Sequence, residues 1–188
     1  MREVLQELLA AYRAGKPVAM ATVVRTWKSA PRPAGAAMLV TSGQEAVGSV
    51  SGGCVEGALF DVGLEILDNG VPQDRKNGNS DDEAFGVGLT CGGIIEVFAE
   101  RVDTVTWPEL EGVAASVEAQ EAVAIATIVT APDDVAERIG RHLVIRPSGC
   151  EGSLGTERLD DTVREDGLGM LAAGTTGFLH YGGEGERL

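Results

Sequence analysis

A glycine-rich segment that contains a thiol is the part of this chain best suited to chemistry. Residues 48–57 read GSVSGGCVEG and lie between a strand-like run and a helix-like run. Backbone N–H groups in such a turn converge on a concave surface that suits an anion such as phosphate. A helix start also favours the thiolate form of cysteine, here Cys54. The predicted cradle residues are Gly48, Ser49, Ser51, Gly52 and Gly53, and Cys54 stands beside them.

The same segment lacks the groups that a nucleotide-hydrolysing P-loop requires. Gly48 and Gly53 have P-loop spacing, but Cys54 and Val55 stand where Lys and Ser or Thr are needed. The turn therefore has no cation for the β- and γ-phosphates and no hydroxyl for Mg²⁺. We expect a site for a small molecule that carries phosphate or metal, and no ATP hydrolysis. Glu56, in the first helical turn, is explained by the helix dipole alone.

A second glycine cluster, residues 86–93, contains Cys91, Gly92 and Gly93. It begins like a dinucleotide-binding fingerprint, but Cys91 replaces the third glycine. Residues 94–98 then resemble a strand where that motif needs a helix. We expect no NAD site in this cluster. Cys91 either faces the Cys54 site or fills the core, and the sequence leaves both readings open.

Two arginines, Arg25 and Arg32, flank a loop that two prolines stiffen. A guanidinium in this place can fork onto a phosphate, or it is simply a solvated loop arginine. The alternative to a functional thiol at Cys54 is that this residue is a small buried hydrophobic side chain. The three cysteines and two histidines of the chain lack zinc-ligand spacing, so a zinc site is not expected.

Composition limits the classes of partner and the compartment. The chain has 188 residues and a formal net charge of −14, which argues against nucleic acid as a partner. No apolar run approaches membrane-spanning length. The cysteines form no CxxC pair and are odd in number, so we expect reduced thiols and a cytoplasmic protein.

The elements that position these residues recur along the chain. Residues 18–24, 38–40 and 48–51 are echoed by residues 123–129, 143–145 and 152–155, and helix-like residues 55–69 and 157–173 follow. The offset is 104 or 105 each time, which indicates an internal repeat. We predict an α/β fold in which two pseudo-repeats of strand–strand–Gly-rich turn–helix, about 18–102 and 123–188, form one compact mixed-sheet domain over residues 1–188.

Two segments depart from the simple repeat. Residues 72–83 are polar, and we expect them to form a loop that leaves the sheet. The second copy reaches the end of the sequence where the counterpart of strand-like residues 94–102 is due. We expect a partner or a neighbouring segment to complete that sheet.

Three segments resemble the XdhC/CoxI family: residues 25–36 (RTWKSAPRPAGA), 48–56 (GSVSGGCVE) and 89–93 (LTCGG). The resemblance extends through residues 153–155 and 171–174. It implies a maturation factor that binds molybdenum cofactor, protects it during sulfuration and passes it to an apo-enzyme of the xanthine dehydrogenase or CO dehydrogenase type. It also implies that Cys54 holds the cofactor through its metal, with Cys91 as a second thiol.

Many members of the family continue into a Rossmann domain, which these residues do not contain. The resemblance therefore implies the N-terminal domain only, and a separate chain could supply a Rossmann domain. The sequence does not decide whether the protein forms a homodimer. One alternative is a thiol-dependent enzyme in which Cys54 is the nucleophile, although only His142 and His180 are available as histidine bases. Another is an interaction module whose incomplete sheet docks onto a partner.

Overall fold

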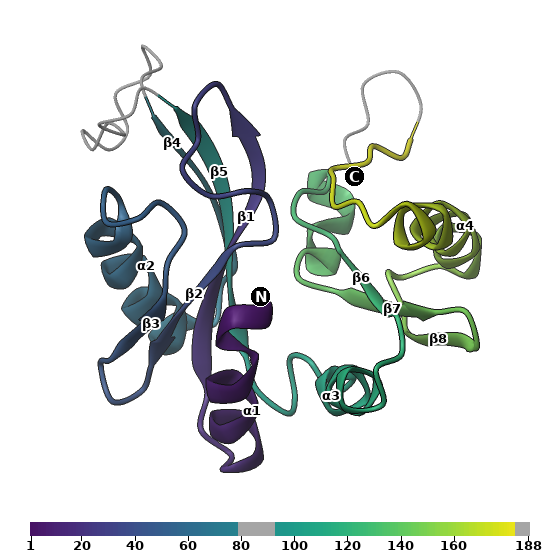
Figure 1. Cartoon of the computed structure of the whole chain (residues 1–188), viewed down its shortest axis with the longest axis horizontal. Helices are drawn as coiled ribbons and strands as arrows, with labels where there is room; N and C mark the ends of the chain where they lie inside the picture. The colour runs from purple at the N-terminus through teal and green to yellow at the C-terminus, as the bar shows by residue number, and fades with distance from the viewer. Residues whose placement is uncertain (79–92, 183–188) are drawn as a thin grey trace. The chain divides into compact units, whose positions relative to one another are not determined.

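The computed structural model describes residues 1–78 and 93–182, so that Cys91 and Gly92 lie outside the described residues (Figure 1). The chain divides into two compact units, Met1–Asp103 and Thr104–Leu188. The boundary falls between the two predicted repeats. Both units combine helices with antiparallel sheets, which confirms the α/β class. No helix among the described residues is long and apolar enough to span a membrane.

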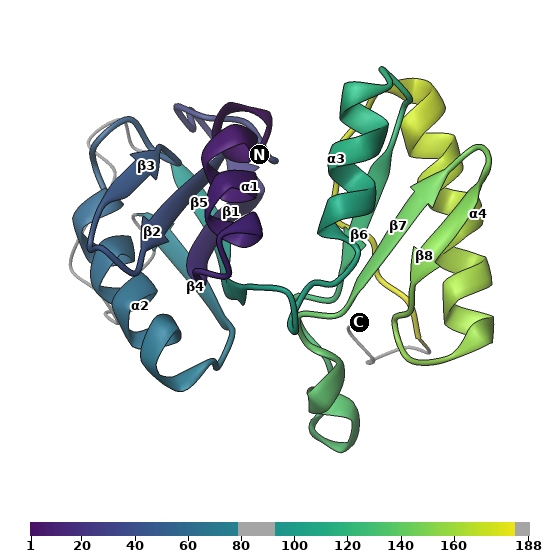
Figure 2. The same ribbon diagram turned by 90° about the horizontal axis from the view of Figure 1, so that it is seen from below.

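The first unit is built on a five-stranded antiparallel sheet with the order β3-β2-β1-β5-β4. Its strands are β1 (Val18–Trp27), β2 (Ala37–Thr41), β3 (Ala46–Gly48), β4 (Gln73–Gly78) and β5 (Ile94–Val102). Its helices are η1 (Arg2–Val4), α1 (Leu5–Arg13) and α2 (Glu56–Asn69). Figures 1 and 2 show α1 and α2 on opposite faces of this sheet.

Alternating residues of the strands face α2 and form the main core of the first unit. The buried members of this cluster include Ala19, Ala21, Val23, Met38, Val40, Leu59, Ile66, Ile95 and Val97. Helix α2 approaches the sheet at Gly63, where an added Cβ would lie 2.6 Å from Val40 Cγ2. The helix that follows the thiol turn is therefore held firmly against β2, because an interior of native density leaves no room for adjustment.

The prediction of a loop over residues 72–83 is wrong for its first half. Residues 73–78 form β4, an edge strand that pairs with β5 from Gln73 opposite Ala99 to Gly78 opposite Ile94. Their polar sequence gives no strand signal, but an edge strand exposes one side to water and tolerates polar residues. Pairing with β5, which is buried along most of its length, overrides the local preference.

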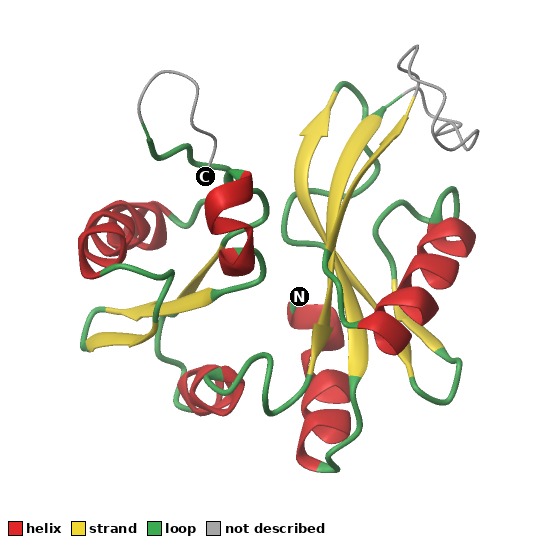
Figure 3. Ribbon diagram, turned by 180° about the vertical axis from the view of Figure 1, so that it is seen from behind, coloured by secondary structure: helices red, strands yellow, loops and turns green. Residues whose placement is uncertain are grey.

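The second unit has a three-stranded antiparallel sheet with the order β6-β7-β8. Its elements are α3 (Leu110–Glu118), β6 (Ala124–Thr127), η2 (Asp133–Arg138), β7 (His142–Arg146), β8 (Gly149–Gly152) and α4 (Glu157–Ala173). Figure 2 shows α3 and α4 on opposite faces of this sheet, as does the secondary-structure view of Figure 3. A separate buried cluster that includes Leu143, Ile145 and Val163 forms its core.

Both units have the order strand, strand, short strand, helix, and specific backbone positions correspond. Gly48 and Gly152 each have φ of +85°, and an added Cβ would lie 2.5 Å from the Ala37 carbonyl oxygen or 2.4 Å from that of His142. Both carbonyls belong to the first residue of the neighbouring strand, β2 or β7. The same close approach of two strands therefore requires glycine in both units.

The two sheets differ at one edge. Strand β1 pairs with β2 on one side and with β5 on the other. Its counterpart β6 pairs with β7, and within the described residues no other strand joins it. In the part of the chain that the structure describes, the second sheet thus has no counterpart of β5 and β4.

Candidate functional site

The thiol turn connects β3 to α2 in the first unit. Gly52 and Gly53 have φ of +76° and +113°, which L side chains rarely adopt. An added Cβ at either glycine would meet nothing within 4 Å, so the outer side of the turn is open. Val50 and Val55 are fully buried and anchor the inner side. The turn thus has a fixed inner face and an accessible outer face.

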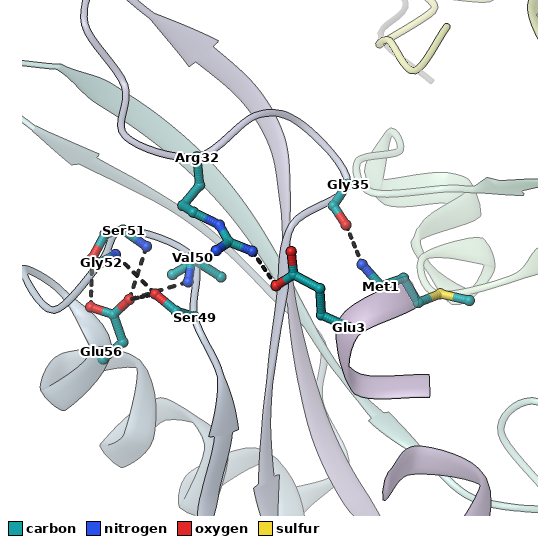
Figure 4. Close-up of polar contacts among 9 residues, drawn as sticks. All are labelled: Met1, Glu3, Arg32, Gly35, Ser49, Val50, Ser51, Gly52 and Glu56. Carbon is teal, nitrogen blue, oxygen red and sulfur yellow. Dashed lines mark hydrogen bonds and ion pairs between the residues drawn. The ribbon is translucent and has the colours of Figure 1, made fainter. Parts of the chain in front are cut away.

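The carboxylate of Glu56 occupies the hollow of this turn. Its Oε1 accepts hydrogen bonds from Ser49 Oγ (2.6 Å), Val50 N (3.1 Å) and Ser51 N (2.9 Å). Its Oε2 accepts from Ser51 Oγ (2.5 Å), Gly53 N (2.8 Å) and Val55 N (3.2 Å). Figure 4 shows Ser49, Val50 and Ser51 gathered around this side chain. Donors of the turn thus converge on an anion, and that anion is a carboxylate of the chain itself. Binding of a cofactor phosphate by this turn stays a prediction.

The explanation of Glu56 by the helix dipole alone is therefore incomplete. Partial burial of this carboxyl group opposes its ionisation, but the hydrogen bonds from Ser49 and Ser51 outweigh burial and lower its pKa to about 2. Hydrogen bonds to the ionised form favour that form. The hollow thus contains a negative charge at any pH near neutrality.

Ser51 connects Glu56 to the thiol residue. Its side chain is buried, and its hydroxyl donates to Glu56 while it accepts from Cys54 N (3.0 Å) and Val55 N (3.1 Å). The backbone of Cys54 is thereby fixed by a relay of two hydrogen bonds. Cys54 carries a reduced thiol, is half-buried and packs against the core cluster under α2.

The proline-containing loop between β1 and β2 touches one predicted site residue, Gly93, and shares a core cluster with another, Cys54. Ala30 packs against the same core cluster as Cys54. An added Cβ on Gly93 would lie 2.8 Å from the Ser29 carbonyl oxygen and 2.9 Å from Ala30 Cα. The backbone at residue 93 therefore touches this loop and has space only for glycine. The roles of Cys91 and Gly92 stay predictions, because both lie outside the described residues.

The two candidate arginines have carboxylate partners in different places. Arg32 binds Glu3 of η1 through its guanidinium, beside the hydrogen bond from the Met1 amine to the Gly35 carbonyl oxygen (Figure 4). Arg25 lies within β1, not in the loop, and its Nε is 3.7 Å from a carboxylate oxygen of Glu96 on β5.

Arg25 also belongs to a cluster of cations around an indole ring. Its guanidinium carbon lies 5.9 Å from the ring centroid of Trp27, and the Lys76 ammonium of β4 lies 5.0 Å from it. Each cation is close enough for a cation–π attraction. The sequence predicts that the two arginines flank one loop. In the structure Arg32 lies on that loop, whereas Arg25 lies within β1.

The second unit repeats the turn without the thiol. Ser153 Oγ and Leu154 N each donate to Asp160 at 2.7 Å, and Gly155 N donates to Ser153 Oγ at 3.1 Å. The residue 104 positions after Cys54 is Arg158. A serine followed seven residues later by a carboxylate thus marks the turn in both units. This spacing is the signal by which the sequence could have revealed the role of Glu56.

Both histidines of the chain belong to the second unit. His142 is buried, stacks on Trp107 with ring centroids 4.1 Å apart, and has Nδ1 3.0 Å from Thr127 Oγ1. His180 lies 4.8 Å from the ring of Phe178. The first unit contains no histidine to serve as a base beside Cys54.

Comparison with known proteins agrees with this description. The model of the XdhC and CoxI family matches residues 11–76 and 116–182. The chain is 39% identical over 87 residues to a probable xanthine dehydrogenase subunit of Bacillus subtilis, an overlap of 44% of this chain and 26% of that protein. It is 35% identical over 101 residues to the molybdenum cofactor insertion chaperone PaoD of Escherichia coli, an overlap of 54% of this chain and 31% of that protein.

A solved structure has the same fold. The crystal structure of a xanthine dehydrogenase from Bacillus halodurans superposes with a TM-score of 0.63 and 25% identity, over 79% of this chain and 44% of that one. The matched regions amount to about a third or less of the length of the two curated relatives.

Proposed function

The chain belongs to the XdhC and CoxI family, and we propose that it binds molybdenum cofactor and delivers it to the apo-enzyme of a molybdenum hydroxylase. Its role is then that of a carrier in enzyme maturation, not that of a catalyst. The relative whose name states such a role is the insertion chaperone PaoD. The acceptors proposed are enzymes of the xanthine dehydrogenase or CO dehydrogenase type, in the cytoplasm.

The observation that carries this proposal is the position of the Cys54 thiol. It follows two exposed glycines whose outer side is open, on a turn whose inner side is buried and hydrogen-bonded. A thiolate is a soft ligand and suits a metal centre that already has sulfur ligands. A rigid turn reduces the conformational entropy lost when cargo binds. Cys54 is thus the proposed metal-binding residue.

Arg32 is the residue we assign to the phosphate of the cofactor. Its present partner, Glu3, has a side chain that is 63% exposed, and an exposed ion pair contributes only about 0–1 kcal/mol. A phosphate can therefore replace this carboxylate at little cost and bind the guanidinium in a bidentate manner. Contacts from Arg25, Gly93 and the amides of residues 48–53 stay predictions. The amides of Val50, Ser51 and Gly53 could bind a phosphate only after the carboxylate of Glu56 had left the hollow.

Two further partners are proposed on the resemblance to the family. The apo-enzyme is the first, and a separate chain with a Rossmann domain is the second. Self-association into a homodimer stays a prediction. The net charge of −14 favours a partner with a basic docking surface.

Cofactor retention tests the proposal directly. Wild type, Cys54→Ala and Cys150→Ala are each incubated with molybdenum cofactor and desalted, and retained molybdenum and pterin are quantified. Cys150 is an exposed free thiol on β8 and serves as the matched control. We expect stoichiometric retention by wild type and Cys150→Ala and a loss of at least tenfold in Cys54→Ala. Equal retention by all three proteins would refute the role of Cys54, and no retention by wild type would refute the function.

A further inference from the structure

The two thiol-turn copies differ in one respect that the proposed function does not explain. Six hydrogen bonds end on the carboxylate of Glu56. Its counterpart Asp160 accepts from Ser153 Oγ and Leu154 N. The second unit builds its strand–turn–helix connection with the two bonds common to both copies, from the serine and from the next amide, together with bonds to the hydroxyls of Ser153 and Thr156 that do not involve the carboxylate. The additional bonds at Glu56 therefore serve something that the second unit lacks.

These additional donors lie on the segment that carries the thiol. They are the amide and hydroxyl of Ser51 and the amides of Gly53 and Val55. Cys54 lies between the last two, and its own amide reaches Glu56 through the Ser51 hydroxyl. In the second unit the equivalent positions are Gly155, Glu157 and Leu159, and Leu159 N donates instead to the helix-capping hydroxyl of Thr156.

We propose that Glu56 is a positioning residue for Cys54: its carboxylate gathers the amides on both sides of the thiol residue and thereby fixes the direction in which the sulfur meets its cargo. This inference rests on the proposed function, since it concerns the same site. Glu56 itself makes no contact with the cargo. In this inference the carboxylate stays in the hollow and supports the thiol, so the amides that it binds no longer count among the predicted phosphate contacts.

The length of the side chain is part of the argument. Glutamate places its two oxygens far enough from α2 to reach both ends of the turn, from Ser49 to Val55. Aspartate is shorter by one methylene, and Asp160 reaches only the Ser153–Leu154 end of its turn. Glu56→Asp should therefore keep the connection to Ser49 and Val50 and release the amides of Gly53 and Val55. The carboxylate of the first turn would then make only the bonds that are common to both turns.

The experiment uses the full chain and compares Glu56→Gln and Glu56→Asp with the matched control Asp160→Asn. Three properties are measured: the melting temperature, the rate of Cys54 alkylation by iodoacetamide from peptide-resolved mass spectrometry, and cofactor retention after desalting. We expect the alkylation rate of Cys54 to change at least threefold in Glu56→Gln, and retention to fall at least tenfold. Glu56→Asp should be intermediate in both. Asp160→Asn should lower the melting temperature and leave both thiol properties at the wild-type value.

The outcomes separate this inference from the proposed function. If wild type retains no cofactor, the function fails, but the alkylation rates still decide whether Glu56 positions Cys54. If Glu56→Asp folds, retains cofactor as wild type does and shows an unchanged alkylation rate, the positioning role is wrong. The same holds if Asp160→Asn changes the Cys54 rate as much as Glu56→Gln does. If Glu56→Gln does not fold, Glu56→Asp alone decides, because it keeps the charge and the two common bonds.

Discussion

The hydroxyl of Ser51 links the carboxylate of Glu56 to the backbone of the thiol turn. This hydroxyl is a donor to Glu56 and an acceptor for two consecutive amides, and the side chain is buried. A buried polar group that loses its partner costs about 1–3 kcal/mol. Removal of this one hydroxyl would break its hydrogen bonds to the amides of Cys54 and Val55. The residue therefore affects both stability and the orientation of the thiol.

Ser51→Ala should lower the free energy of unfolding by about 1–3 kcal/mol. Ser153→Ala is the matched control, because the Ser153 hydroxyl bonds Asp160 in an exposed position. We expect the control to lose less than about 1 kcal/mol, since an exposed donor can turn to water. Urea denaturation of both variants measures the difference. Equal losses in the two variants would contradict the special role of the Ser51 hydroxyl.

Glu56 also predicts a pH dependence of stability. Hydrogen bonds lower its pKa to about 2 in the folded chain, against an ordinary pKa of 4.5 in the unfolded chain. The folded-state pKa is the lower one, so this stabilisation is complete above pH 4.5 and is lost as the pH falls toward 2. Without screening, the difference corresponds to roughly 3 kcal/mol. Solvent screening of this partly exposed group reduces that value to about 1–2 kcal/mol.

The check is the stability of wild type and Glu56→Gln as a function of pH. Wild type should be more stable at pH 7, and the two curves should converge between pH 4.5 and 2. Glutamine keeps the shape of the side chain but donates where the carboxylate accepts. A constant difference between the curves through this range would show that the ionised carboxylate is not the cause.

At the scale of elements, hydrophobic periodicity predicts most of the fold. Strand β5 and helix α4 have the bounds that the sequence indicates, because both carry a strong apolar pattern or clear capping residues. The short edge strands β3 and β8 and the polar strand β4 were not predicted. Strands β3 and β8 form hairpins with the strands just before them, but both are short and carry no apolar pattern. Strand β4 pairs with β5, which follows it only after residues 79–93, and no local pattern in its polar sequence records that pairing. The network around Glu56 was missed for a different reason: it is local, and the serine seven residues earlier signals it, but the helix dipole already explains a carboxylate in a first helical turn.

Helical glycines give an element-scale prediction that the sequence alone could not make. An added Cβ at Gly63 of α2 would lie 2.6 Å from Val40 Cγ2 and 2.8 Å from Val40 Cβ, so that helix and strand must separate. An added Cβ at Gly57 of the same helix would meet nothing within 4 Å. Gly63→Ala should therefore lower the free energy of unfolding by about 1–3 kcal/mol. Gly57→Ala should raise it by about 0.5–1 kcal/mol, because alanine favours the helix.

Gly167 of α4 provides a graded comparison for these two variants. Its added Cβ would lie 2.5 Å from Ile145 Cδ1, the flexible end of a side chain, and no closer than 3.7 Å to Cγ1. Gly167→Ala should thus be less destabilising than Gly63→Ala. Chemical denaturation of the three variants gives the order. A Gly63→Ala variant as stable as wild type would show that α2 does not pack as closely on β2 as described.

At the scale of the whole chain, each unit has a hydrophobic core of its own. Ile66 belongs to the cluster under α2, and Ile145 belongs to the cluster of the second sheet; both side chains are fully buried. The candidate chemistry is confined to the first unit, where the thiol turn lies. A defect in the second core should therefore leave the Cys54 turn intact.

Ile145→Ala and Ile66→Ala test this separation by hydrogen exchange. Each removes a buried isoleucine and should cost about 2–5 kcal/mol locally. Amides of the affected sheet should then exchange at least ~30-fold faster, because every 1.4 kcal/mol is a factor of about ten in the opening equilibrium. We expect Ile145→Ala to accelerate β6 and β7 and to leave β1, β2 and the Cys54 alkylation rate unchanged, whereas Ile66→Ala does the reverse. Val105→Ala, at a side chain that is 85% exposed, is the control without effect. Equal acceleration of both sheets by either core variant would show that the units open together, and the thiol turn would then depend on the second unit for its stability.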